Sequence, residues 1–294
     1  MMAILQFLGF VVPLIGLITT AILLRRFASF IHVYFLHRSA IQRYALDDDT
    51  FAVVTGATGG MGKAIAEDLY DRGFNLVIHG RSQEKLDRVK EELLQRGPLK
   101  KIVHTLRINA EDTSTYDFSS LKGLKITAVF LVAGGASVQT VPYDQVSSEY
   151  ANGVIRLNAL FPIDLLRALL PQMRAAKVPM LVVGIGSITG RYPAPFLSIY
   201  SASKSFLLRL IHGLSIDESF HDPSADTTFH YMNVGEVISP GSFTKEPNLF
   251  CPTPETIARA IIRVVGCGHR EVIPVAAKIM GKHMNLGEGK NKNE

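Results

Sequence analysis

The sequence predicts an α/β protein in which a doubly wound parallel sheet of about seven strands follows an N-terminal transmembrane helix. Two observations predict the sheet. From residue 51 onward, short runs rich in β-branched residues alternate with stretches of helical periodicity, and glycine-rich or polar turns separate them. A third observation predicts the helix, because residues 3–24 contain no charged side chain.

The composition narrows the classes of protein to which the chain can belong. Of its 294 residues 47% are hydrophobic, and the mean hydropathy of +0.20 is high enough to indicate a membrane element. The net charge is only +5, and lysines and arginines are interspersed with acidic residues, so we expect no nucleic-acid partner. Cys251 and Cys267 are too few for a disulfide framework and fit a reducing compartment.

The apolar excess is concentrated at the start of the chain. Residues 3–24 are long enough to cross a hydrocarbon core of about 30 Å. Arg25 and Arg26 follow directly, whereas a cleaved signal peptide has its basic residues before the apolar run. The positive-inside rule then places the rest of the chain in the cytosol. We predict a signal anchor, with residues 27–36 lying along the membrane surface or re-entering it; the alternative is a buried core helix.

The C-terminus agrees with this orientation. The chain ends in KNKNE, residues 290–294, and this KxKxx pattern resembles the dilysine-type retrieval signal of endoplasmic reticulum membrane proteins, which coat proteins read in the cytosol. A short basic tail also arises by chance. Together with the anchor, the tail predicts an endoplasmic reticulum membrane protein whose globular domain is cytosolic.

Three regions follow from these changes in composition. We expect a membrane anchor and juxtamembrane segment at residues 1–45, a globular domain at 46–280 and a basic tail at 281–294. The acidic run at 47–49 is predicted to be a solvated turn rather than a metal site, and no metal ion is expected. The expected strands are 51–55, 75–79, 101–108, 128–132, 180–185, 228–234 and 271–275. The expected helices are 62–72, 83–95, 152–173, 200–218 and 254–265.

A glycine-rich turn follows the first expected strand, and a helix follows the turn. Its sequence is TGATGGMG, residues 55–62. Glycine permits positive φ and lets a pyrophosphate approach the backbone, while the free N–H groups of the helix N-terminus attract an anion. In this strand–turn–helix context the pattern predicts dinucleotide binding rather than a merely structural turn.

The end of the second expected strand indicates which dinucleotide. Where folds that prefer NAD place an acidic residue, this chain has Arg81 and then Ser82. A guanidinium suits a 2′-phosphate, and the serine hydroxyl is a further donor. We therefore expect NADP(H), against the alternative of a solvated arginine at the start of a helix.

Four motifs in order resemble the short-chain dehydrogenase/reductase family. They are the TGxxxGxG turn at 55–62, Asn158 in RLNALF, Ser187 in GIGSITG, and the YxxxK pair Tyr200 and Lys204. The resemblance extends over residues 51 to about 275, and it implies a Rossmann-like fold. By this resemblance the cofactor-binding residues are Gly56, Thr58, Gly60, Met61, Gly62, Arg81, Ser82, Asn109, Ala133, Gly134, Tyr200, Lys204, Gly235, Val237 and Ser239.

The residue types of these motifs suit reduction of a ketone. The oxygen that gains negative charge needs a proton donor, which Tyr200 can be. Lys204, one helical turn later, is expected to lower the pKa of that phenol and to bind the nicotinamide ribose. Ser187 is expected to hold the carbonyl oxygen, and Asn158 to anchor a water that resupplies protons. Each residue also has a simpler interpretation as a helix cap, a surface lysine or a buried tyrosine.

Two stretches depart from the family pattern. At the end of the fourth expected strand the family has NNAG, whereas residues 132–135 read VAGG, which leaves the local geometry open. Where the family has PGxxxT to hold the carboxamide, the best match is VGEVIS, residues 234–239; the rival alignment uses Gly241. Both departures argue against a housekeeping enzyme of fatty-acid elongation.

Within the family the chain resembles membrane-anchored 17β-hydroxysteroid dehydrogenases and very-long-chain 3-oxoacyl-CoA reductases. The resemblance rests on the apolar leader, RSQEKLDRVKEEL at 81–93, IYSASKSF at 199–206 and PTPETIARAIIRVVG at 252–266. It implies NADPH-dependent reduction of a lipophilic ketone, a substrate lid or an ordinary connection at 240–252, and a homodimer through the helices of Asn158 and Tyr200. The alternatives are a non-redox nicotinamide-dependent isomerase or dehydratase and an inactive membrane-anchored binding protein.

Overall fold

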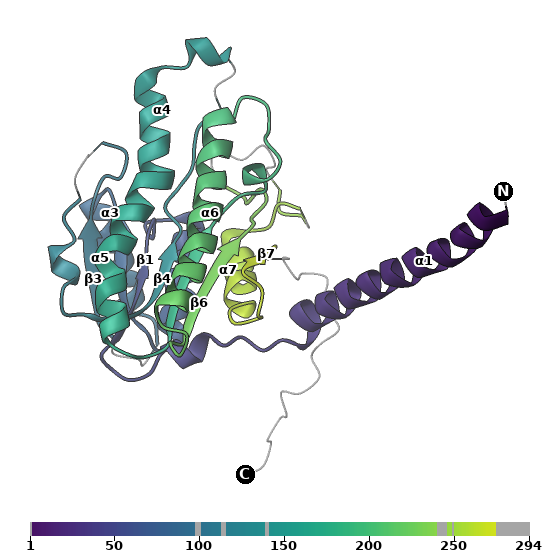
Figure 1. The fold of residues 1–294 in the computed structure, drawn as a ribbon. Helices are drawn as coiled ribbons and strands as arrows, with labels where there is room; N and C mark the ends of the chain where they lie inside the picture. Colours follow the sequence, from purple (N-terminus) through teal and green to yellow (C-terminus); the bar gives the residue numbers. More distant parts are fainter. Residues whose placement is uncertain are drawn as a thin grey trace.

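Seven parallel strands form one sheet in the order β3-β2-β1-β4-β5-β6-β7 (Figure 1). The computed structural model describes residues 2–97, 101–112, 116–138, 141–239, 246–248 and 250–274. The strands are Thr50–Val54 (β1), Asn75–Gly80 (β2), Val103–Arg107 (β3), Lys125–Leu131 (β4), Met180–Ile185 (β5), Thr227–Met232 (β6) and Glu271–Val272 (β7). The chain reverses its direction of winding between β1 and β4, which is where open α/β sheets bind ligands. The predicted doubly wound fold is confirmed.

Two layers of helices cover the two faces of the sheet. Gly60–Asp71 (α2), Gln83–Leu94 (α3) and Pro254–Arg263 (α7) lie on one face, and Ser148–Ile155 (α4), Phe161–Ala175 (α5) and Ser198–His221 (α6) on the other (Figure 1). Short 3-10 turns occupy Ile41–Tyr44 (η2), Ser119–Leu121 (η3), Tyr143–Gln145 (η4) and Ile188–Gly190 (η6). Both helix layers are amphipathic, so each sheet face has its own apolar core.

The expected strands and helices are present, with shifted ends. The strand expected at 271–275 is short, and residue 275 lies outside the described part of the chain. The single helix expected at 152–173 is instead α4 and α5 with a π-helical turn, Arg156–Leu160 (η5), between them. A π turn inserts one extra residue into the helix and is typical of functional sites, and Asn158 lies in this one.

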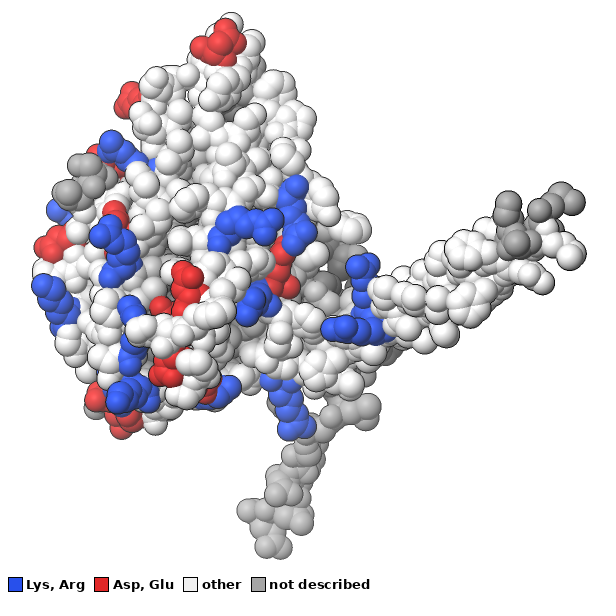
Figure 2. Space-filling view, viewed as in Figure 1, with Lys and Arg blue, Asp and Glu red and all other residues white. Residues whose placement is uncertain are grey.

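The N-terminal helix is continuous through the basic pair that was expected to end it. Met2–Ile31 (α1) is followed directly by the π-helical His32–Leu36 (η1), so residues 27–36 are not a separate or re-entrant element. Gln6–Leu36 is long and apolar enough to cross a membrane. Figure 1 shows α1 projecting away from the sheet and its helices. In Figure 2 the described residues of this projection are white beyond the basic atoms at its base, whereas acidic and basic residues are interspersed over the globular part.

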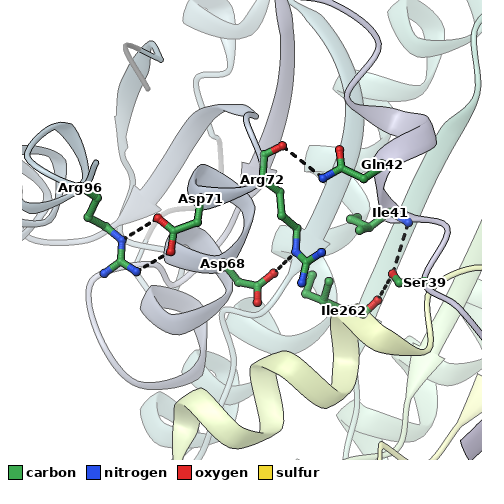
Figure 3. Close-up of polar contacts among 8 residues, drawn as sticks. All are labelled: Ser39, Ile41, Gln42, Asp68, Asp71, Arg72, Arg96 and Ile262. Carbon is green, nitrogen blue, oxygen red and sulfur yellow. Dashed lines mark hydrogen bonds and ion pairs between the residues drawn. The ribbon is translucent and has the colours of Figure 1, made fainter. Parts of the chain in front are cut away.

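The juxtamembrane segment packs onto the globular part. Val33, Ile41 and Tyr44 are buried in the core on the α2 and α7 side of the sheet. The Ser39 hydroxyl donates a hydrogen bond to the carbonyl oxygen of Ile262 at the end of α7, as Figure 3 shows. Packing of the globular part therefore begins before residue 46, where the domain was predicted to start.

Polar contacts continue this packing across α2. Gln42 donates to the carbonyl oxygen of Arg72, Nε2 to O, at 3.4 Å, and the Arg96 guanidinium contacts both carboxylate oxygens of Asp71 at 3.0 and 2.6 Å (Figure 3). The acidic run predicted to be a solvated turn pairs with lysines: Asp47 with Lys125 at 2.5 Å and Asp48 with Lys101 at 2.6 Å.

Candidate active site

The glycine turn lies at the point where the sheet changes its winding direction. Gly56 has φ +67° and Gly60, the first residue of α2, has φ +53°, a region that side chains rarely adopt. A Cβ at position 62 would lie 2.2 Å from the Gly56 carbonyl oxygen, so α2 packs directly against the turn. Only glycine fits there. The turn thus brings the free N–H groups of α2 to the carboxyl end of β1.

A cavity of about 300 Å³ opens above this turn. Its lining includes eight of the predicted cofactor residues: Gly56, Thr58, Met61, Gly62, Arg81, Asn109, Ala133 and Gly134. Gly60 and Ser82 lie beside the cavity without lining it. The glycine cradle, the helix N-terminus and a lining that includes both the glycine turn and Arg81 fit a dinucleotide, whose pyrophosphate these N–H groups would bind.

Arg81 and Ser82 are placed differently from each other. The Arg81 guanidinium lines the cavity, is exposed, and lies 3.5 Å from the Glu111 carboxylate, Nη1 to Oε2. The Ser82 hydroxyl caps α3, where it accepts a hydrogen bond from the backbone N–H of Lys85 at 3.4 Å. Capping leaves the serine O–H free to donate, so both side chains remain available to an anion at this end of the cavity.

His79 also lines the cavity, and the sequence analysis did not single it out. Its Nδ1 accepts from the Gly56 N–H at 3.2 Å, which requires that Nε2 carry the proton; Nε2 lies 3.2 Å from the carbonyl oxygen of Ile108. Burial lowers the pKa of His79 to about 4, so the ring is neutral at pH 7. The ring therefore ties the glycine turn to the end of β3. The sequence signal for this role was a histidine within the largely apolar strand NLVIHG.

The end of β4 is held without the family's asparagines. The Thr55 hydroxyl oxygen accepts from the backbone N–H groups of Val132 at 2.8 Å and Ala133 at 2.9 Å. A Cβ at position 134 would lie 2.7 Å from both Asn158 Oδ1 and Lys204 Nζ. Glycine at this position therefore lets the two polar side chains approach the backbone of the loop. These contacts define the geometry of residues 132–135, which the sequence left open.

Asn158 is bonded on every side by backbone. Its Oδ1 accepts from the Gly135 N–H at 3.1 Å, and its Nδ2 donates to the carbonyl oxygens of Gly135 and Val154, each at 2.9 Å. The side chain is only 1% exposed. The π turn η5 places it against the loop after β4, where it holds that loop. Anchoring of a water by this residue stays a prediction.

Ser187, Tyr200 and Lys204 meet at the end of β5. Ser187 follows the strand and caps η6, its Oγ accepting from the Thr189 N–H at 3.2 Å. Tyr200 and Lys204 lie one turn apart in α6, with the ammonium 5.7 Å from the centre of the phenol ring. The Ser187 side chain lies close enough to the Tyr200 phenol to lower its pKa. The structure thus brings together the residues that the spacing pointed to.

The protonation of this group follows from its burial. Lys204 is 3% exposed and donates to the carbonyl oxygen of Ile185 at 3.0 Å, and burial lowers its pKa to about 8. Burial raises the pKa of the Tyr200 phenol, and the nearby Ser187 side chain offsets part of that rise. Lowering of the phenol pKa by Lys204 is not seen here and stays a prediction for the cofactor-bound site.

The segment after β6 reaches the same edge of the sheet. Gly235 lies three residues beyond β6. It faces Ile188, because a Cβ added at position 235 would lie 3.3 Å from Ile188 Cδ1. Val237 packs against the core, and Ser239 ends the described stretch. None of these three residues lines the glycine-turn cavity. The rival Gly241 lies outside the described residues, as do 240–245 and 249 of the expected lid.

A second cavity, of about 180 Å³, opens beside Tyr200. Aromatic and aliphatic side chains dominate its lining: Val141, Pro142, Tyr143, Val146, Tyr150, Phe196, Leu197 and Ile199. Phe196 has φ +62°, a conformation that costs a bulky residue energy and that clusters at functional sites. The described lining contains no charged side chain. This cavity suits an apolar molecule with one polar group at Tyr200.

Comparison with known proteins defines the class of this one. The family model for short chain dehydrogenase matches residues 50–222, more than half of the chain. The chain belongs to the short-chain dehydrogenase/reductase family, whose members are oxidoreductases that use NAD(P)(H).

Particular relatives follow at lower similarity. A very-long-chain 3-oxoacyl-CoA reductase of Kluyveromyces lactis is 29% identical over 240 residues, covering 78% of this chain and 68% of its own. A protein of the same description from Anas platyrhynchos is 31% identical, covering 74% and 69%. A short-chain dehydrogenase of Sphingobium yanoikuyae, solved with NADPH, has a TM-score of 0.65 at 22% identity, covering 79% and 89%; at that identity it shows the shared fold.

Proposed function

We propose that the protein reduces a lipophilic ketone to its secondary alcohol with NADPH, or carries out the reverse oxidation. Its substrate is a 3-oxoacyl-CoA, a steroid or terpenoid ketone, or a polyketide ketone. The observation that carries the proposal is the uncharged, aromatic-lined cavity that opens on Tyr200. An apolar substrate body in that cavity leaves a carbonyl oxygen as the one polar group to be met by the phenol.

The side chains around Tyr200 have distinct roles in this proposal. Ser187, whose side chain lies near the phenol, holds the carbonyl oxygen while Tyr200 donates the proton that the new alkoxide takes up. NADPH, when bound in the glycine-turn cavity, supplies the hydride. Lys204 lies within reach of Tyr200 and of the loop after β4, so its positive charge stabilises the phenolate that Tyr200 becomes once it has given up its proton. Asn158 keeps that loop in place and anchors a water at the end of the relay.

NADPH rather than NADH is supported by the charge at the far end of the glycine-turn cavity. Arg81 lines that end and is held near Glu111 at 3.5 Å. A 2′-phosphate carries more charge than the carboxylate and would take over the guanidinium, with Ser82 as a second donor. The Sphingobium neighbour was solved with NADPH.

The substrate class is tested by measuring NADPH consumption on a panel of ketones. The protein, with its membrane helix and in detergent or vesicles, would be incubated with long-chain 3-oxoacyl-CoAs, steroid ketones and aromatic polyketide ketones. The products would be identified by mass spectrometry. Stoichiometric loss of NADPH with formation of the alcohol supports the proposal. Conversion without net loss of NADPH indicates an isomerase or dehydratase. Binding without conversion across the panel indicates an inactive binding protein, and either result contradicts the proposal.

The location follows from the anchor. The helix Gln6–Leu36 is apolar enough to cross a membrane, and within it Arg25 and Arg26 follow the uncharged stretch on the side of the globular part, which supports an endoplasmic reticulum protein with its catalytic domain in the cytosol. Retrieval through KxKxx by coat proteins remains part of this proposal, and the tail lies outside the described residues. Protease added to intact microsomes should degrade the catalytic domain; its protection would contradict this orientation.

Association into a homodimer is supported by apolar side chains exposed on the helices of one face. On α6 these are Phe206, at 43% exposure, and Phe220, at 84%. Leu160, at 44%, is exposed beside Asn158 in η5. Such residues are costly in water and are covered in an interface. Light scattering of the detergent-solubilised protein measures the mass; a monomer would contradict this part of the proposal.

A further inference from the structure

One buried hydroxyl group lies between the two segments that carry the candidate catalytic residues. It belongs to Tyr231 in β6, a side chain that is not exposed at all. The hydroxyl oxygen accepts from the backbone N–H of Ser187 at 3.3 Å, and the O–H donates to the backbone carbonyl of Lys204 at 3.1 Å. A single group therefore links the loop after β5 to α6.

The chain makes room for this tyrosine at two glycines. A Cβ at position 186 would lie 1.9 Å from Cζ of the Tyr231 ring, so only glycine can precede Ser187 while the ring is in place. A Cβ at position 190 would lie 3.0 Å from the same hydroxyl and 3.1 Å from the Lys204 carbonyl carbon. The loop on which Ser187 stands, from Gly186 to Gly190, is thus shaped around the Tyr231 ring and hydroxyl.

We propose that Tyr231 is a positioning residue: its hydroxyl fixes the Ser187 loop against the turn of α6 that presents Tyr200 and Lys204. The proposal rests on the proposed function, because it assigns a task within that reaction. Ser187 and Tyr200 come from different elements, and the approach of their hydroxyl groups depends on how those elements are spaced. A side chain bonded to the backbone of both elements sets that spacing directly.

Tyr231 is suited to positioning and not to proton transfer. It lines neither the glycine-turn cavity nor the cavity beside Tyr200. Burial raises its pKa to about 12, so it stays a neutral phenol, able to accept one hydrogen bond and donate another at the same time. The charged groups that face it are Glu271 and Arg191, which pair with each other, and the phenol of Tyr200 lies within electrostatic range.

Tyr231→Phe tests the proposal because it removes the hydroxyl and keeps the ring. We expect kcat for ketone reduction to fall about 10-fold, which corresponds to about 1.4 kcal/mol. The KM for ketone and the Kd for NADPH should stay within about 2-fold, because the lost spacing acts on the reacting group and not on cofactor binding.

Tyr44→Phe is the matched control. Tyr44 is equally buried, and its hydroxyl donates to Thr228 Oγ1 at 2.9 Å, a residue that is also in β6. Both variants should lower the midpoint of urea unfolding, Tyr231→Phe the more because it loses two hydrogen bonds and Tyr44→Phe one, but only Tyr231→Phe should lower kcat. Equal kcat in the two variants would overturn the proposal.

A second measurement needs no turnover. In protein carrying isotope-labelled tyrosine, NMR titration of the Tyr200 signal, assigned with Tyr200→Phe, reports its pKa with NADP⁺ bound. We expect that pKa to rise in Tyr231→Phe, because the Ser187 side chain that lowers it is no longer held beside the phenol. An unchanged titration overturns the positioning role even if no ketone on the panel reacts. A raised pKa in a protein without turnover keeps the positioning role and rejects only the proposed reaction.

Gly186→Ala examines the same contact from the other side. The added methyl group cannot coexist with the ring of Tyr231, so we expect the ring to move and kcat to fall at least as far as in Tyr231→Phe. Adding Gly186→Ala to the Tyr231→Phe protein should lower kcat by less than it does alone, because the hydroxyl contact is already lost. Fully additive losses would contradict a shared cause.

Discussion

The loop after β5 and the loop after β4 lie next to each other at the carboxyl edge of the sheet, and they build their parts of the site in different ways. The first presents a functional group: the Ser187 side chain, which lowers the pKa of the Tyr200 phenol. The second presents almost no side chains to the site; instead, polar side chains from other elements approach its backbone closely. At Gly134, Asn158 and Lys204 come within 2.7 Å of where a Cβ would stand. The loop after β5 therefore acts through a side chain. The loop after β4 acts through the space at its glycine and through hydrogen bonds to its backbone.

The largest effect is expected in the loop that depends on functional groups. Tyr200→Phe removes the proton donor, and we expect kcat to fall about 1,000-fold, within the range for loss of a general acid. The Kd for NADPH, measured by fluorescence titration, should be unchanged. A variant that keeps a tenth of the normal rate would refute the assignment of Tyr200.

The next largest effect is expected on the cofactor side, where His79 should make the free energy of unfolding depend on pH. The unfolded state takes up a proton at His79 below pH 6.5, but the folded state only below about 4. The stabilisation is complete above pH 6.5 and is lost as the pH falls toward 4, by about 3 kcal/mol. Urea unfolding across this window measures the loss, and His79→Gln should flatten the curve. His230, whose pKa is also about 4, would contribute the slope that remains. A slope unchanged by His79→Gln would contradict this account.

Filling the space at Gly134 should also impair turnover. In Gly134→Ala the methyl group displaces Asn158 or Lys204, and we expect kcat to fall about 30-fold, or about 2 kcal/mol. Gly213→Ala in α6 is the control, because nothing lies within 4 Å of its Cβ. That control should retain full activity with slightly higher stability. Normal turnover in Gly134→Ala would show that the loop does not need this close approach.

A smaller loss is expected when the backbone of the same loop is left unsatisfied. Thr55→Val keeps the shape but removes the oxygen that accepts from Val132 and Ala133. We expect the free energy of unfolding to fall by about 2 kcal/mol. Thr127→Val, which loses a single bond to the carbonyl of Tyr44, should lose about half as much. Equal losses in the two variants would argue against the double role of Thr55.

The smallest effect concerns the choice of cofactor. Arg81→Ala should raise the KM for NADPH about 10-fold and leave the KM for NADH unchanged, because an exposed guanidinium contacts only the 2′-phosphate. Lys85→Ala, on the exposed start of α3, provides a control for loss of positive charge alone. A lower KM for NADH than for NADPH in the unaltered protein would reject the NADP(H) assignment.

The sequence alone determined much of this protein. Alternating strand and helix patterns predicted the parallel sheet, because burial on both faces makes each strand a short apolar run. The glycine turn and the spacing from Ser187 to Lys204 predicted the two halves of the site, because these depend on local backbone geometry and on one turn of helix.

Tertiary structure decided what depends on contacts between elements far apart in the chain. His79 and Tyr231 look like ordinary strand residues, and Thr55 like the mere start of the glycine turn, until the sheet sets β2, β6 and the end of β1 beside the loops that they bond. The π turn around Asn158 and the docking of Ser39 on α7 likewise have no signature in a short window of sequence. Hydrogen bonds of this kind join residues by position in space, and local patterns carry no record of their partners.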